Sequence, residues 1–258
     1  MDPATIIGVL LGFGGIFGAM VMEGGNPAAI ISPPALVLIF VGTFGACMAS
    51  NTLPGTIGAI KWLIYGLTAK KADVQGVVEP LVKMAEKARR EGLLALESEM
   101  ESVEDDFMRR GLQMAVDGTD ADDLYEILSA EVKAKKTSAA AGAGFWTDAG
   151  GYSPTIGIIG TVVGLIHVLE NLSHPDELGH LIAGAFVATL WGVLSANVMF
   201  LPFGKRIKAV IANETARMEL VIEGVLAIQA GANPRVVATK LQSKMTAPGP
   251  AAPAKEAA

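Results

Sequence analysis

Long uncharged stretches alternate with charged ones along the chain. No Asp, Glu, Lys or Arg occurs from Pro3 to Met22, and a second such run extends from Gly24 to Ile60. Two more extend from Ala149 to His167 and from Leu181 to Gly204. About 20 residues cross the hydrocarbon core of a bilayer as a helix. The pattern therefore predicts four transmembrane helices, at residues 5–22, 34–50, 149–167 and 181–204.

Between the second and third uncharged runs, apolar residues recur at the spacing of an amphipathic helix. They follow three- and four-residue steps from Val74 to Ala88, with charged side chains such as Lys83 and Glu86 on the other side. Gly92 interrupts this stripe, which then continues from Leu93 to Val103. We expect this segment to be helical, with a break at the glycine.

A further helix is expected after a turn at Asp117-Gly118. Thr119 or Asp120 is a suitable N-cap, and the apolar residues from Leu124 to Leu128 follow it. Residues 137–144, with the sequence TSAAAGAG, are all small. We expect them to form a joint before the third transmembrane helix.

These patterns together predict an all-α membrane protein with four transmembrane helices, a helical cytoplasmic domain between helices 2 and 3, and a cytoplasmic C-terminal helix. The expected segments are a hairpin of transmembrane helices 1 and 2 (1–50), the cytoplasmic helical domain (51–153), transmembrane helices 3 and 4 (154–204), the cytoplasmic C-terminal helices (205–245) and a disordered tail (246–258). The tail is rich in Pro and Ala, a composition that does not pack into a core.

The distribution of basic residues predicts the orientation in the membrane. Twelve Lys and Arg lie between Asn51 and Ser153, and eight lie after Gly204, which accounts for all 20. The two expected loops at residues 23–33 and 170–179 contain none. By the positive-inside rule these loops face outward, so both termini and the middle segment are expected in the cytoplasm.

Composition and charge narrow the possible functions. The chain has 258 residues, of which 51% are hydrophobic and 18% charged, and its mean hydropathy is +0.45. Soluble domains usually carry about 25% charged residues, so an ordinary soluble enzyme is not expected. The net charge of -6 argues against binding to nucleic acid. A single cysteine, Cys47, excludes an internal disulfide framework.

The expected transmembrane helices hold no Asp, Glu, Lys or Arg, although ion pumps and channels usually need an intramembrane carboxylate. If the chain moves ions, the carboxylate is expected to come from a partner. Hydroxyl groups and prolines near the inner ends of the third and fourth helices are the remaining candidates for chemistry: Thr155, Thr161, Thr189, Ser195, Pro154 and Pro202. Alternatively, the hydroxyls bond to their own helix backbone and the prolines mark helix ends.

Other candidate sites are weaker. Three histidines, at 167, 174 and 180, straddle a loop but lack a supporting cysteine, so no metal site is predicted. Ser195 lacks the surroundings of a nucleophilic serine, so no enzymatic activity is predicted. Charged residues between Lys87 and Asp106 form a basic cluster followed by an acidic one. They are either a docking surface or a solvated helix face.

Three sequence motifs, in the order in which a known family has them, resemble that family. They are SPTIGIIGTVVGLIHVLENL (153–172), ATLWGVLSANVMFLPFGKRI (188–207) and AGANPRVVATKL (230–241). With the four expected helices, they resemble the flagellar motor stator A subunit, the MotA/PomA family, over all but about the last dozen residues. The alternatives are a TolQ/ExbB-like ion-driven energiser of an envelope process, in a group that lacks the first hairpin, and a purely structural membrane scaffold.

The resemblance implies a specific function and specific residue roles. Members of this family are homopentamers in the bacterial inner membrane, arranged around a dimeric MotB/PomB-type B subunit that brings an ion-binding aspartate. They pass H⁺ or Na⁺ and produce torque on the rotor protein FliG, without a cofactor. By the motifs, Thr161 and Thr189 would lie on the ion pathway, Pro154 and Pro202 would couple ion passage to conformational change, and Arg89 and Glu97 would engage FliG. The aromatic position of the family's TLYG motif is filled here by Trp191.

Overall fold

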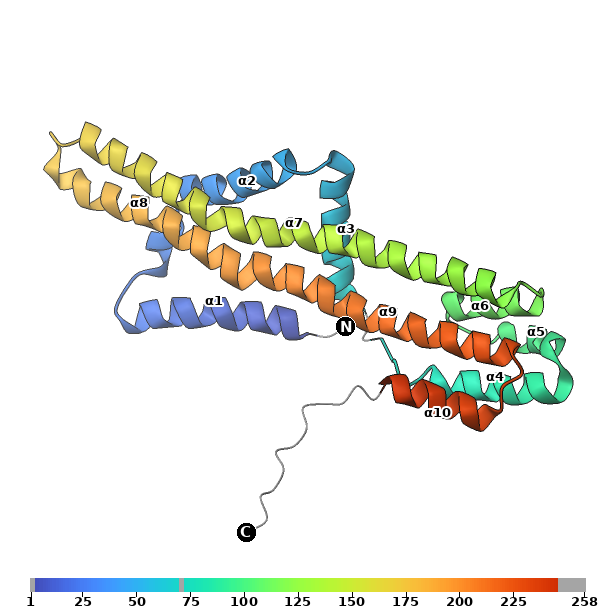
Figure 1. Cartoon of the computed structure of the whole chain (residues 1–258). Coiled ribbons are helices and arrows are strands. Elements are labelled where there is room, and N and C mark those ends of the chain that lie inside the picture. The colour runs from blue at the N-terminus through green and yellow to red at the C-terminus, as the bar shows by residue number, and fades with distance from the viewer. Residues whose placement is uncertain (1–2, 70–71, 246–258) are drawn as a thin grey trace, which may run out of the picture. The chain divides into compact units, whose positions relative to one another are not determined.

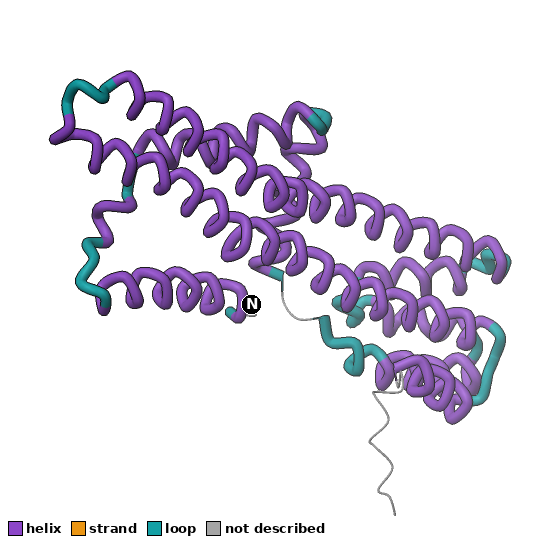
Figure 2. The backbone as a smooth tube through the Cα atoms, turned by 60° about the vertical axis from the view of Figure 1, so that its left-hand side comes forward, coloured by secondary structure: helices purple, strands orange, loops and turns teal. Residues whose placement is uncertain are grey.

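The structure, a computed structural model, describes residues 3–69 and 72–245. All the regular elements of these residues are helices, as Figures 1 and 2 show. The all-α fold that the sequence predicts is therefore confirmed. The expected disordered tail at 246–258 lies outside the described residues.

The contacts divide the helices into two compact units. Within the described residues, the first unit consists of residues 3–69 and 138–210, and the second of residues 72–137 and 211–245. The first unit contains α1 (Ala4–Met22), η1 (Pro27–Ile30), α2 (Pro33–Ala49), α3 (Leu53–Thr68), α8 (Pro175–Ser195) and η3 (Ala196–Phe200). Two long helices, α7 (Ala121–Glu170) and α9 (Leu201–Gln229), contribute residues to both units.

The unit boundaries differ from the expected segment boundaries at residues 50, 153 and 204. Helix α3 and the 138–153 part of α7, which we assigned to the cytoplasmic segment, pack within the first unit. The indole nitrogen of Trp146 donates a hydrogen bond to the Ala59 carbonyl oxygen at 3.0 Å, and that of Trp62 donates one to the Ser138 hydroxyl at 3.0 Å. Where the membrane begins and ends along these helices stays a prediction.

Three helices of the described residues are long and apolar enough to cross a membrane. They are α1, α7 and the continuous helix Pro175–Gln229, while α2 is a shorter apolar helix of 17 residues. Large apolar side chains are exposed along the first unit, among them Leu10, Val41 and Leu169. Such a surface is unfavourable in water and fits a hydrocarbon environment. Apolar helices thus occur at all four predicted positions, and the count of four spans stays a prediction.

The second unit is built around an amphipathic core. It contains α4 (Val78–Glu91), η2 (Leu93–Leu96), α5 (Glu97–Met100), α6 (Asp106–Val116) and α10 (Pro234–Met245), together with the start of α7 and the end of α9. Its fully buried side chains include Leu81, Leu112 and Leu241. Helix α4 ends before Gly92, whose φ of 85° lies in the region that suits glycine. The predicted break at Gly92 is therefore confirmed.

The expected joint at residues 137–144 is wrong, because α7 is continuous from Ala121 to Glu170. Alanine is the best helix former, so an alanine-rich segment need not interrupt a helix. Its small residues serve close packing instead. A Cβ atom on Gly142 would lie 2.7 Å from the Trp62 side chain, and Ala139 and Ala143 are fully buried. The N-cap of this helix is Asp120, whose Oδ1 accepts a hydrogen bond from the Asp122 backbone N–H.

Candidate ion pathway between two apolar helices

Helices α7 and α8 approach each other closely because glycines line their contact. A Cβ atom on Gly157 of α7 would lie 3.0 Å from the Ala188 carbonyl oxygen of α8, and one on Gly164 would lie 2.6 Å from the Ala185 Cβ. Small residues let helix backbones come this close in apolar surroundings. Polar groups of one helix therefore reach the backbone of the other.

Thr161 of α7 and Thr189 of α8 meet at this contact. Their hydroxyl oxygens are in direct hydrogen-bonding contact. The Thr161 Oγ1 also lies 3.1 Å from the Ala185 carbonyl oxygen, and the Thr189 Oγ1 lies 3.2 Å from the Gly157 carbonyl oxygen. Both side chains are half-buried. Two hydroxyl and two carbonyl oxygens therefore form one cluster, which we call the threonine cluster.

The threonine cluster offers neutral oxygen ligands and no fixed charge. A hydroxyl group has one proton and two lone pairs, so it can accept a hydrogen bond from a water molecule or contact a small cation. The apolar segments of the chain contain no carboxylate that would balance a cation. The cluster is thus suited to complete an ion site whose charge comes from another chain.

A second pair of hydroxyl groups joins the same two helices. Ser153 Oγ and Ser195 Oγ are 2.7 Å apart, and both side chains are fully buried. Ser153 Oγ also donates a hydrogen bond to the Gly192 carbonyl oxygen at 3.0 Å. Sequence reasoning singled out Ser195 but missed Ser153, although the eight-residue spacing from Ser153 to Thr161 places both on one face of a helix.

The two prolines lie within continuous helices rather than at their ends. Pro154 is inside α7, and its Cα would lie 3.3 Å from a Cβ atom on Gly192. Pro202 follows η3, a π-helical turn that connects α8 to α9 without a break. Since proline lacks an N–H, each one leaves the carbonyl four residues earlier, in Gly150 or Val198, without its helical donor. Both helices therefore have a locally weakened backbone beside the hydroxyl pairs.

Trp191 holds α8 against η1 and the helices α1 and α2. Its indole nitrogen donates a hydrogen bond to the Ile30 carbonyl oxygen at 2.7 Å, and its ring lies beside the rings of Phe13 and Phe40. Buried tryptophan normally finds a partner for its N–H. The aromatic residue next to the hydroxyl clusters thus anchors α8 to η1 and α1.

Arg89 and Glu97 lie in the second unit, on either side of the break at Gly92. Arg89 is in the last turn of α4, and Glu97 is the first residue of α5. Both side chains are exposed, and neither forms an ion pair with another described residue. Lys87, by contrast, pairs with Glu99 at 2.7 Å. The two charges that the resemblance selects are therefore available to a partner.

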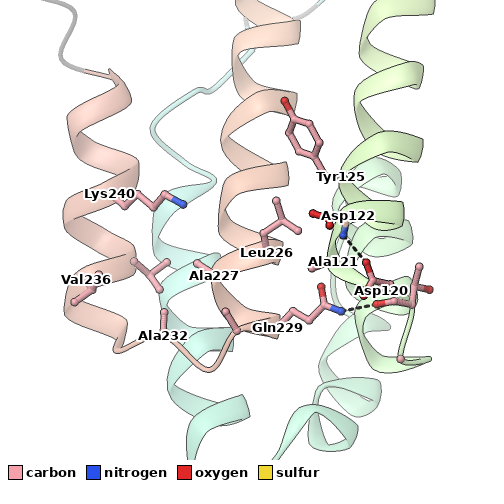
Figure 3. Close-up of a pocket in the computed structure, with 14 residues that line it drawn as sticks. Asp120, Ala121, Asp122, Tyr125, Leu226, Ala227, Gln229, Ala232, Val236 and Lys240 are labelled. Atoms are coloured by element: carbon pink, nitrogen blue, oxygen red, sulfur yellow. Dashed lines mark hydrogen bonds between the residues drawn. The ribbon is translucent and has the colours of Figure 1, made fainter.

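A cavity of about 860 Å³ in the second unit is separate from these residues (Figure 3). It lies between the start of α7, the end of α9 and the first turns of α10. Gln229 on its wall donates a hydrogen bond to the Thr119 carbonyl oxygen, as the dashed line in Figure 3 marks. None of the candidate residues lines this cavity. Within the described residues, no three His, Cys, Asp or Glu side chains are grouped so as to hold a metal ion.

Two family descriptions match the chain. "MotA/TolQ/ExbB proton channel family" matches residues 99–220, and "Motility protein A N-terminal" matches residues 6–92. Motility protein A of Bacillus subtilis is 39% identical over 245 residues, which are 93% of this chain and 90% of that protein. Chemotaxis protein PomA of Vibrio alginolyticus is 32% identical over 243 residues, which are 94% and 95% of the two chains.

Two solved structures have the same fold. A chain of the C. jejuni MotAB structure is 30% identical, with a TM-score of 0.90 over 97% of this chain and 98% of that one. A chain of the flagellar MotAB stator complex from Bacillus subtilis is 37% identical, with a TM-score of 0.84 over 92% and 93% of the two chains. The likeness therefore covers both compact units.

Proposed function

The chain belongs to the MotA/TolQ/ExbB proton channel family and is an ion-channel stator subunit of a flagellar motor, and on that basis we propose how its residues perform this function. With a MotB/PomB-type partner it forms a channel for H⁺ or Na⁺ and converts ion flow into torque on the rotor. The match of residues 6–92 to the motility protein A description favours this function over that of a TolQ/ExbB-like energiser.

The threonine cluster is the observation that carries the proposal for the ion pathway. Thr161 and Thr189 contact each other and two backbone carbonyl oxygens. A dehydrated ion needs such oxygens in place of its hydration shell, and a proton can use a water that they hold. The membrane helix of the B subunit brings the missing carboxylate to this cluster.

Pro154 and Pro202 couple the ion step to movement. A change in charge on the partner's carboxylate alters its attraction to the threonine cluster, and the weakened backbone at the prolines lets α7 and α9 respond. Proline-containing helices kink more easily than regular ones because one backbone hydrogen bond is missing. The movement then reaches the second unit through these two helices.

Arg89 and Glu97 contact the rotor protein FliG. Both are exposed charges near a helix break, and neither forms an ion pair within the described part of the chain. Opposite charges on the rotor would steer and orient the contact without a large apolar interface. Several copies of the chain, five by the resemblance, surround the B subunit in the inner membrane with both termini in the cytoplasm.

The decisive experiment is complementation of a motility mutant at different external sodium concentrations. The chain and its B subunit are expressed in a motility mutant, and swimming speed is measured against external sodium at a fixed proton-motive force. A stator function predicts restored swimming, and speed that rises with sodium identifies a sodium motor. Speed that is independent of sodium but lost with the proton-motive force identifies a proton motor. If both proteins reach the membrane and copurify but no motility returns, the proposal is wrong.

A further inference from the structure

The Ser153 and Ser195 hydroxyls are bonded differently from the hydroxyl of Thr56, another buried residue of the first unit. Thr56 bonds to the Thr52 carbonyl oxygen of its own chain segment, as helical threonines commonly do. Ser153 instead bonds across to α8, and Ser195 contacts both Ser153 and the Trp191 carbonyl oxygen, the latter at 2.7 Å. This buried polar pair therefore links α7 and α8 at a second place, apart from the threonine cluster.

The pair has more acceptors than protons, so its hydrogen bonds can be arranged in two orders. Each hydroxyl donates one proton. In the first order, Ser153 donates to Ser195, which donates to the Trp191 carbonyl oxygen. In the second, Ser195 donates to Ser153, which donates to the Gly192 carbonyl oxygen at 3.0 Å. The second order joins the helices by two bonds and the first by one, so rotation of two hydroxyls changes how firmly the helices are held.

The Ser153–Ser195 pair lies next to Pro154 on one helix and next to the turn that leads to Pro202 on the other. Ser153 directly precedes Pro154, and Ser195 is the last residue before the π-helical turn η3 that leads to Pro202. One turn before Pro154, a Cβ atom on Gly150 would lie 2.5 Å from the Leu201 side chain, next to Pro202. π-helical turns often occur at functional positions. The pair thus bridges the two places at which these helices are weakened.

We propose that Ser153 and Ser195 form a switchable latch, which exchanges between its two hydrogen-bond orders as the motor cycles and thereby keeps the movements at Pro154 and Pro202 in step. The inference rests on the proposed stator function and goes beyond it. The two serines are positioning residues that do not contact the ion. Their role is transmission, which separates their effect from that of the threonine cluster.

The first test measures torque and ion dependence separately. Ser153→Ala and Ser195→Ala are expressed with the B subunit, and stall torque is measured with beads tethered to flagella over a range of coupling-ion concentrations or driving force. We expect stall torque to fall about fivefold, on the order of the change that one hydrogen bond makes to an equilibrium constant. The half-saturating ion level, the membrane level and copurification with the B subunit stay at wild-type values. The double variant should lose no more torque than either single one, because exchange between the two hydrogen-bond orders needs both hydroxyls.

Thr68→Ala is the control. Thr68 is an exposed residue of α3 in the first unit, and its hydroxyl bonds to the Ile64 carbonyl oxygen of its own helix. It should keep full torque. Full torque in either serine variant, additive losses in the double variant, or failure of copurification would each overturn the latch. If the wild-type chain restores no motility, the stator function itself fails, which is a distinct result.

A second test locks the pair. Two atoms 2.7 Å apart are close enough for the corresponding cysteines to form an S–S bond of about 2.05 Å. In Ser153→Cys/Ser195→Cys, an added oxidant should stop rotation and a reductant should restore it, while each single cysteine variant turns under both conditions. The native Cys47 is present in all three, so the single variants control for its pairing. A disulfide confirmed by mass spectrometry that leaves torque unchanged would contradict exchange of the latch.

Discussion

Gly157 of α7 and Gly192 of α8 face each other so closely that a Cβ atom on Gly192 would lie 3.1 Å from the Gly157 Cα. The same Cβ would lie 2.7 Å from the Ser153 carbonyl oxygen, a backbone atom that cannot move aside like the end of a flexible side chain. The crossing of the two helices therefore depends on the absence of one methyl group.

Gly192→Ala is expected to destabilise the complex by about 1–3 kcal/mol through overpacking, despite the better helix propensity of alanine. The midpoint of thermal unfolding of the chain copurified with its B subunit measures this change. Gly184→Ala is the control, since Gly184 is an exposed residue of α8 with nothing near its Cβ position. Equal unfolding midpoints for the two variants would show that α7 and α8 do not pack as described.

Thr161→Ala and Thr189→Ala should impair rotation without loss of assembly. In a sodium motor, loss of a hydroxyl ligand should raise the half-saturating sodium concentration about tenfold, as expected for a hydrogen bond to a charged group. Thr161→Ser and Thr189→Ser keep the hydroxyl group, so cells with either variant should swim at nearly wild-type speed. Normal swimming of Thr161→Ala at low sodium would exclude sodium coordination by this residue and favour a proton motor.

Attachment of α10 to α9 should depend on pH through Glu223. Burial opposes ionisation of Glu223, but hydrogen bonds from the Lys240 and Lys244 ammonium groups outweigh it and hold the Glu223 pKa below its ordinary value of 4.5. A lowered folded-state pKa adds stability that is present above the unfolded-state pKa and lost as pH falls through the folded-state pKa. Protection of α10 from hydrogen exchange should therefore decrease below about pH 4.5.

Glu223→Gln should lose this pH dependence and weaken the attachment at neutral pH by about 1 kcal/mol, the upper end for partly exposed ion pairs. The Lys240 and Lys244 side chains are 50% and 49% exposed, so a larger effect is not expected. Lys83→Gln is the control, because its partner Glu79 is exposed and lies on the same helix. An unchanged pH profile in Glu223→Gln would assign the dependence to other carboxylates.

Reversal of the charge at Arg89 or Glu97 should reduce torque several-fold, while membrane level and copurification with the B subunit are unchanged. A reversed charge on the rotor should partly restore torque, because the contact depends on charge complementarity. Arg235→Glu, at an exposed position on α10, is the control. If both reversals gave full torque, these residues would belong to an ordinary solvated surface.

Reporter fusions test the orientation. A reporter that works only in the cytoplasm should be active after Lys136 or Lys244 and inactive after Glu23 or Asp176, because the basic residues flank one side of the apolar helices. Immunoblots of the fusions control for their amounts in the membrane. Activity after Asp176 would rule out four spans with both termini inside.

The sequence was informative where an element depends on local composition. Apolar runs and amphipathic spacing located the helices, and the positive φ of Gly92 and the N-cap at Asp120 follow from the chemistry of those residues. The motifs around Pro154 and Pro202 also identified the family. The motifs also selected Thr161 and Thr189, whose hydroxyl groups contact each other in the structure.

What sequence alone missed depends on contacts between distant segments. The small residues at 137–144 have a composition that is common in flexible connections, yet they lie within a continuous helix. Trp62 can pack against this helix because Gly142 has no side chain. The local sequence at Ser153 indicates no function, because a lone serine beside a proline is common in turns. Its importance arises only from Ser195, 42 residues away. No local pattern reveals a partner at that distance.

The π-helical turn η3 also holds one residue more than an α-helical turn needs. Both kinds of turn complete about one revolution, so deletion of a single residue between Ala196 and Phe200 should convert η3 into a regular α-helical turn and leave Pro202 and Ile207 at nearly the same angle around the helix axis relative to α8. A deletion farther along α9 has no such turn to absorb it and would rotate the following side chains by about 100°. Single-residue deletions should therefore be tolerated better within η3 than in the regular helix on either side of it.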